Sequence, residues 1–208
     1  MEHSLKTLYI VLLWLSSVGV ALYALAAYTL LTPGTTVHPQ MKAVYAEERW
    51  GIMLHVLGAF CALFLGPAQF SRSLRARSPR LHRALGRVYL FAGVLVGGGA
   101  GLYMSFHAFG GALSTSGFAT LSVLWLFTGA LAFRSALRRD FVSHRAWMIR
   151  NFALTFAAVT LRVQLGACAA AGLTFEIFYP LLAWTSWLPN LIAAEWIVRR
   201  RARPAPGP

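Results

Sequence analysis

Residues 144–162 read HRAWMIRNFALTFAAVTLR, with a His-Arg pair at one end and Arg162, embedded in apolar sequence, at the other. From Trp147 the chain remains overwhelmingly apolar to Ala171. At about 1.5 Å per residue, this run is long enough for an α-helix to cross a hydrocarbon core of roughly 30 Å. The stretch therefore predicts a membrane-spanning helix. Because a charge inside a span is costly and usually functional, Arg162 is the first candidate site residue.

The composition extends this prediction to the whole chain. Its 208 residues are 58% hydrophobic and 12% charged, and the mean hydropathy is +0.60, outside the range of soluble domains. We therefore expect an all-α, polytopic integral membrane protein whose single transmembrane domain (1–198) precedes a basic cytoplasmic tail (199–208). Six spans are predicted at about 7–31, 51–70, 89–109, 118–133, 147–171 and 175–198.

The net charge of +13 is explained by where the charges fall. With six spans, only Lys42 and Arg49 of the 19 lysines and arginines lie in loops on one side, and Arg162 lies within a span. All the others fall on the opposite side, which the positive-inside rule identifies as the cytoplasm. Both termini are therefore expected there. The excess charge indicates attraction to anionic lipid, and no nucleic-acid partner is expected.

Several kinds of site are not indicated. Cys61 and Cys168 lie in apolar runs without a C-x-x-C pattern, so neither a zinc site nor a disulfide framework is predicted. The chain has no G-x-S-x-G, Walker or H-E-x-x-H motif, so no hydrolase or kinase is indicated. Whether the protein is an enzyme stays open, with an oxidoreductase or electron-transfer component as the one class considered.

Four histidines lie at the ends of predicted spans, His55 and His107 towards the outer surface and His82 and His144 towards the inner one. Imidazoles from facing helices are common axial ligands of haem iron. The paired depths suggest two sites for haem b, one at each face, which together would carry electrons across the membrane.

Two other interpretations of these histidines stay open. Histidines at helix ends often contact lipid headgroups or water. His82 and His144 are followed directly by Arg83 and Arg145, and such His-Arg pairs suit contact with phosphate equally well.

Arg162 needs a partner for its charge. Its expected depth is close to that of His55 in the outer half of the membrane. Glu176, just across the outer turn, is the simplest counter-ion, while Glu48 or a ligand carboxylate such as a haem propionate would also serve.

The last predicted span carries further polar candidates. Asn190 and Glu195 lie in its inner half, where Glu195 can neutralise Arg199 one turn on or act in a proton or quinone pathway. Arg150, at the end of the second basic loop, is another candidate. A weak repeat, LHRALGRVYLFAG (81–93) and SHRAWMIRNFALT (143–155), suggests two parallel halves. Gly93, Gly97 and Gly101 indicate close helix packing.

The sequence resembles a known family. His55 and Gln69, HRALGRVY at 82–89, the GG and GF of 110–118, the 144–162 stretch, and W-x-x-W-x-x-N with AEW at 184–196 are similar to bacterial inner-membrane proteins classed as domain of unknown function 2306. The likeness covers most of residues 50–198 and implies a bacterial multi-span protein. More distantly, histidines at two depths resemble two-haem proteins of the cytochrome b561 type. Those proteins take ligands from four consecutive helices, whereas the fourth span here has no histidine.

The leading functional hypothesis is thus a b-type haem electron carrier in the bacterial inner membrane, with a quinol or small reductant as partner. The alternatives are a transporter or a protein that binds an anionic ligand or lipid, in which Arg162 holds the anion, and a subunit or assembly factor without chemistry of its own. A homo-oligomer or a larger membrane complex is compatible with each.

Overall fold

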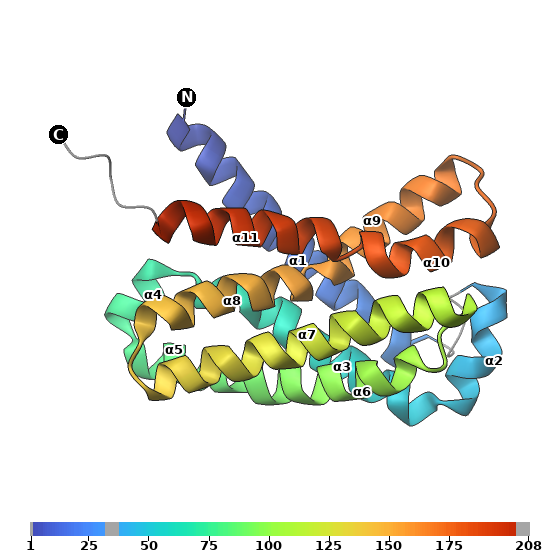
Figure 1. The fold of residues 1–208 in the computed structure, drawn as a ribbon, viewed down its shortest axis with the longest axis horizontal. Coiled ribbons are helices and arrows are strands. Elements are labelled where there is room, and N and C mark those ends of the chain that lie inside the picture. Colours follow the sequence, from blue (N-terminus) through green and yellow to red (C-terminus); the bar gives the residue numbers. More distant parts are fainter. Residues whose placement is uncertain (1, 32–37, 203–208) are drawn as a thin grey trace.

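The computed structural model describes residues 2–31 and 38–202, and within these ranges every regular element is helical (Figure 1). The elements are α1 (Glu2–Thr29), α2 (Pro39–Glu47), α3 (Arg49–Gln69), α4 (Arg72–Arg77), α5 (Pro79–Val88), the π-helix η1 (Tyr89–Val96), α6 (Gly97–Ser105), α7 (Gly111–Leu137), α8 (Phe141–Thr155), α9 (Ala157–Ala170), α10 (Phe175–Thr185) and α11 (Leu188–Ala202). The all-α prediction is confirmed.

Five helical stretches in the described residues are long and apolar enough to cross a membrane: Thr7–Thr29, Arg49–Gln69, Pro79–Ser105, Gly111–Leu137 and Phe141–Ala170. They correspond to the first five predicted spans. Three of them extend well beyond the apolar runs, because a helix continues into polar sequence once it is outside the hydrocarbon region. The polytopic membrane class therefore holds, while the sidedness of the termini stays a prediction.

The predicted sixth span, 175–198, is not one continuous helix. It is divided at Ser186 and Trp187 into α10 and α11, neither of which meets the length of a span alone. Pro189 has no N–H to donate to the carbonyl of Thr185, so the helical ladder is interrupted there. That carbonyl instead accepts a hydrogen bond from Gln164 Nε2 at 3.2 Å. α10 packs on α7 and α9, and α11 packs on α8 (Figure 1).

Segments expected to be loops contain short helices. In the basic segment 71–87, Ser71 caps α4 by accepting from the Leu74 N–H at 3.1 Å, and Pro79 begins α5. α2 occupies much of the predicted 32–50 loop. α11 runs to Ala202, so the described part of the predicted tail 199–208 is helical.

Glycine allows α3 to pack very closely on η1 and α6, which belong to the third membrane-spanning stretch. A Cβ placed on Gly58 would lie 2.5 Å from the Gly97 Cα, and one placed on Gly93 would lie 2.9 Å from the Ala62 Cβ. The packing role predicted for Gly93 and Gly97 is therefore confirmed. This contact fixes the depth of His55 on α3 relative to α6.

A buried hydrogen-bond network joins η1, α7 and α8 at the centre of the bundle. Tyr89 and Asn151 are each fully buried, and the tyrosine hydroxyl donates to Asn151 Oδ1 at 2.7 Å. Asn151 Nδ2 donates to the Trp125 carbonyl at 2.7 Å and to Thr128 Oγ1 at 2.9 Å, while Trp125 Nε1 donates to Thr155 Oγ1 at 2.9 Å. Because these polar groups form hydrogen bonds with one another, the network holds the three helices together, and we assign it a structural role.

Candidate anion-binding cavity

A cavity of about 190 Å³ lies inside the half of the bundle that contains α2, away from the arginine-rich end formed by α4, α5 and the α7–α8 turn. The residues that line it belong to α1, α2, α3, α6, α7, α8, α9 and α10 and to the turns that follow α6 and α10. The polar groups in that wall include Tyr28, His55, Arg162, Tyr179 and Ser186. A smaller pocket of about 50 Å³ between α1, α3 and α9 shares His55 and Arg162 with it.

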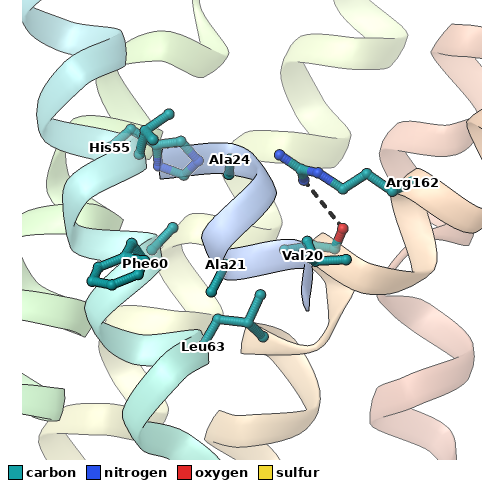
Figure 2. A pocket seen from close by; sticks show the side chains of 10 residues that line it. Val20, Ala21, Ala24, His55, Phe60, Leu63 and Arg162 are labelled. Atoms are coloured by element: carbon teal, nitrogen blue, oxygen red, sulfur yellow. Dashed lines mark hydrogen bonds between the residues drawn. The ribbon is translucent and has the colours of Figure 1, made fainter. Parts of the chain in front are cut away.

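Arg162 extends from α9 into the smaller pocket, towards the side where His55 lies (Figure 2). Its Nη1 donates to the carbonyl of Ala158, one turn earlier in the same helix, at 3.1 Å. None of the ion pairs among the described residues includes it. A hydrogen bond to a carbonyl leaves the positive charge uncompensated.

The carboxylates expected to neutralise Arg162 have other partners. Glu176 Oε1 accepts from Gln40 Nε2 at 2.5 Å, which ties α10 to α2. Glu48 accepts from the Tyr103 hydroxyl at 2.6 Å and lies 3.5 Å from His107 Nε2. The fold therefore does not bring Arg162 together with either predicted counter-ion.

His55 is oriented by the backbone of the neighbouring helix. Its Nδ1 lies 2.8 Å from the Gly97 carbonyl oxygen. Because a carbonyl only accepts, Nδ1 carries the proton in this contact and Nε2 is left as an acceptor in the neutral ring. Gly101 leaves the room for the ring, since a Cβ there would lie 2.7 Å from His55 Nδ1.

The outer pair of predicted haem ligands does not fit a haem in this arrangement. Both ring nitrogens of His107 face protein acceptors, Nδ1 at 3.2 Å from the Tyr103 carbonyl and Nε2 at 3.5 Å from Glu48 Oε1. The cavity beside His55, at about 190 Å³, is also smaller than the pockets of roughly 300–1,000 Å³ that hold drug-sized ligands. A porphyrin is larger than such ligands and therefore needs more room than this cavity has.

The inner pair of histidines lies together at the arginine-rich end. His82 and His144 are close enough to interact electrostatically, although 62 residues separate them in the chain. His144 Nδ1 lies 2.8 Å from the Ala132 carbonyl, which fixes the ring against α7. His82 Nδ1 is buried without a hydrogen-bond partner.

The remaining predicted residues form structural contacts or lie at the surface. Arg150 of α8 bridges to Glu195 of α11 at 2.7 Å, and Glu195 also binds Arg199 at 2.9 Å, as the spacing predicted. Asn190 Nδ2 donates to Thr160 Oγ1 at 2.9 Å and links α11 to α9. The side chains of Arg83 and Arg145 are exposed.

Ser186 is a cavity residue that sequence reasoning missed. It is 1% exposed, lines the cavity, and its Oγ has no hydrogen-bond partner. An unpaired buried hydroxyl is costly and calls for an explanation. The signal in the sequence was its position three residues before Pro189, where a helix interruption places a polar side chain inside the bundle.

Two helix interruptions border the cavity. One separates α8 from α9 at Phe156, beside the lining residues Thr155 and Ala157, and the other separates α10 from α11 at Ser186. Discontinuous membrane helices occur at the substrate sites of many transporters, because the interruption exposes backbone and side-chain polar groups at membrane depth.

Comparison with known proteins agrees with this description at the level of the family. The family described as "Predicted membrane protein (DUF2306)" matches residues 52–198, a range that runs from α3 into α11. No curated protein and no solved structure matches the chain, so the more distant likeness to cytochrome b561 gains no support from them. The match extends over more than half of the sequence, and the chain therefore belongs to the DUF2306 family of predicted membrane proteins.

Proposed function

We propose that this membrane protein binds a small organic anion in the cavity beside Arg162 and carries it across the bilayer. The observation that supports this most directly is the uncompensated guanidinium of Arg162 in a cavity wall. A charge inside a membrane protein costs from about 2.5 to above 10 kcal/mol unless it is paired. With Glu176 and Glu48 engaged elsewhere, an anionic ligand is the natural partner.

The cavity also limits the kind of anion. Its volume of about 190 Å³ is somewhat larger than the engineered protein cavity of about 150 Å³ that holds benzene. Apolar and aromatic side chains form most of the wall, while Arg162, His55 and the unpaired Ser186 hydroxyl provide polar groups. A monocarboxylate with a compact apolar body, of about the size of benzoate, fits both the volume and the polarity.

The helix interruptions favour transport over static binding. The interruptions at Phe156 and at Ser186 both border the cavity, and at the second one Pro189 cannot donate a backbone hydrogen bond, so the ladder between α10 and α11 is weaker than in a continuous helix. Hinges at such element ends absorb the backbone change in domain and helix rearrangements.

The proposal is tested by measuring thermal unfolding of the protein and its uptake of ligand, with benzoate as the ligand in both experiments. We expect benzoate to raise the unfolding midpoint of the detergent-purified protein with saturation, and reconstituted vesicles to take up labelled benzoate. Arg162→Gln should abolish both effects, and Ser186→Ala should weaken binding by about tenfold, the size of a lost hydrogen bond to a charged group. Arg87→Gln, an exposed charge at the other end, is the matched control and should behave as wild type.

A measurement without any ligand tests the same idea independently. If Arg162 is uncompensated, Arg162→Gln should raise the free energy of unfolding by roughly 1–3 kcal/mol, because the variant no longer carries an unpaired charge at membrane depth. A loss of several kcal/mol in the ligand-free protein would mean that Arg162 is paired within the fold, and the proposed anion site would have to be abandoned.

A second candidate function is supported by the inner histidines. His82 and His144 lie together. The contact of His144 Nδ1 with the Ala132 carbonyl leaves its Nε2 available as a metal ligand, because metal-binding histidines commonly donate their other ring N–H to a carbonyl. These two residues would hold a single haem b, which would supply one-electron chemistry. A Soret band with α and β bands after dithionite reduction, lost in His144→Ala, would support it, and a colourless protein expressed with ample haem would exclude it.

A further inference from the structure

The fold gathers four arginines from three separate helices at one end of the molecule. Arg72 and Arg75 belong to α4, Arg145 lies near the start of α8, and Arg201 lies in the last turn of α11. α4, the start of α8 and the end of α11 lie at the same end of the bundle (Figure 1). We refer to these four residues as the arginine cluster.

Two members of the cluster, Arg75 and Arg201, lie within the electrostatic reach of the other two. Burial, followed by the nearby charges of Arg145 and Arg72, lowers the pKa of Arg75 below its usual value. The same causes in the same order lower the pKa of Arg201. Arg72 and Arg145 therefore lie close to both of the other members. Like charges held together in this way destabilise the fold unless an anion joins them.

No carboxylate of the described residues is paired with the arginine cluster. Glu195, the acidic residue of α11, is shared by Arg150 and Arg199. Asp140 precedes α8 and caps it by accepting from the Ser143 N–H at 3.0 Å. The excess positive charge of this end is thus left for an external partner.

Two buried polar groups beside the cluster also lack hydrogen-bond partners. Arg75 Nη1 donates to the main-chain oxygen of Gln69 at 3.0 Å, which fixes one guanidinium of the cluster against the end of α3. Gln69 itself is 6% exposed, and its amide Nε2 has no hydrogen-bond partner. His82 of α5, the helix that packs on α4, has a buried Nδ1 without a partner as well.

We propose that the arginine cluster is a binding site for a multivalent phosphate anion, supplied by the headgroup of a phospholipid with two phosphates. Guanidinium groups bind phosphate through paired N–H donors, and several of them around one site match a diphosphate better than a single charge. Basic pockets at the ends of membrane helices are suited to such headgroups, because the apolar helices place them at headgroup depth. This site is separate from the Arg162 cavity and does not depend on the function proposed for it.

The test compares arginines inside and outside the cluster in lipid nanodiscs. We expect cardiolipin added to phosphatidylcholine nanodiscs to raise the unfolding midpoint of the protein in a saturable way. Arg145→Gln and Arg201→Gln should each raise the half-saturating cardiolipin fraction by about tenfold or more, the effect of a lost charged hydrogen bond. Arg77→Gln is the matched control, because Arg77 is an exposed arginine of α4 outside the cluster. Diffuse surface attraction predicts at most about a fivefold loss for it.

Two further arms identify the source of the phosphate. Phosphatidylglycerol at equal total charge should give a weaker, less saturable shift than cardiolipin. Inorganic pyrophosphate in pure phosphatidylcholine nanodiscs tests a soluble anion, and a cluster-dependent shift with pyrophosphate would support the site with a soluble ligand instead of a lipid. Equal losses in Arg77→Gln and Arg145→Gln, or no saturable shift with either cardiolipin or pyrophosphate, would overturn the proposal.

Discussion

At the residue scale, single atoms determine whether the Arg162 cavity exists in its present shape. His55 occupies one side of it because Gly97 provides a carbonyl acceptor and Gly101 provides space. Arg162 occupies another side with a hydrogen bond only to its own helix. The two side chains come from α3 and α9, so the cavity depends on how these helices are held and not on any local motif.

Substitution of Gly101 tests this dependence. The Cβ of Gly101→Ala would overlap the His55 ring, so we expect the ring to move and the Gly97 hydrogen bond to be lost. The free energy of unfolding should fall by about 1–3 kcal/mol, as for other overpacked sites. Chemical denaturation measures the change, and benzoate binding should weaken in parallel.

Gly99→Ala is the control for Gly101→Ala. It lies in the same helix with no atom near the position of the new Cβ. There the substitution should raise stability by about 0.5–1 kcal/mol, because alanine loses less backbone entropy than glycine in a helix. Equal effects at the two positions would contradict the tight contact with His55.

At the scale of elements, the repeat seen in the sequence corresponds to a contact in the fold. Tyr89 lies seven residues after His82, and Asn151 lies seven residues after His144. These equivalent positions are joined directly by the hydrogen bond from Tyr89 to Asn151, and the two histidines also lie near each other. The two repeats thus meet through corresponding residues, as related halves of a membrane fold do.

The attachment of α11 provides a prediction at this scale. Arg150 and Glu195 join α8 to α11, while Arg199 and Glu195 lie within α11 itself. A double-mutant cycle with Arg150→Met and Glu195→Gln should give a coupling energy of about 0.5–1 kcal/mol, since the pair is partly exposed to solvent. The corresponding cycle with Arg199→Met and Glu195→Gln should give a coupling energy of about 0.3 kcal/mol. A larger coupling for Arg199 would mean that the interhelical bridge does not hold α11.

At the scale of the whole molecule, the distribution of charge predicts how the protein lies in its membrane. The arginine-rich loops, α4, α5 and the end of α11 gather at one end, and α2 and the α9–α10 turn lie at the other (Figure 1). The positive-inside rule then predicts that the arginine-rich end faces the cytoplasm.

Cysteine labelling of intact cells checks this orientation. In a chain with Cys61 and Cys168 replaced by serine, Thr174→Cys in the α9–α10 turn should react with a membrane-impermeant maleimide. Arg138→Cys in the α7–α8 turn should react only after lysis. Both positions are exposed, so access alone does not distinguish them. The reverse pattern would invert the topology and place the Arg162 cavity in the cytoplasmic half.

The sequence by itself determined the membrane class and the first five of its six predicted spans, because apolar length is a local property of the chain. It also predicted the glycine packing of Gly93 and Gly97 and the pairing of Glu195 with Arg199. These are short-range or compositional effects, which need no knowledge of which helices become neighbours.

Only the tertiary structure decided which groups meet across helices. In the fold, Glu176 accepts a hydrogen bond from Gln40 and Glu48 accepts one from Tyr103, so neither carboxylate pairs with Arg162. The last predicted span is divided at Ser186. The tertiary structure also gathered Arg72, Arg145 and Arg201 from distant segments. Such contacts depend on the rotation and depth of each helix against its neighbours. That packing is set by side-chain shape over the whole bundle, and no single stretch of sequence encodes it.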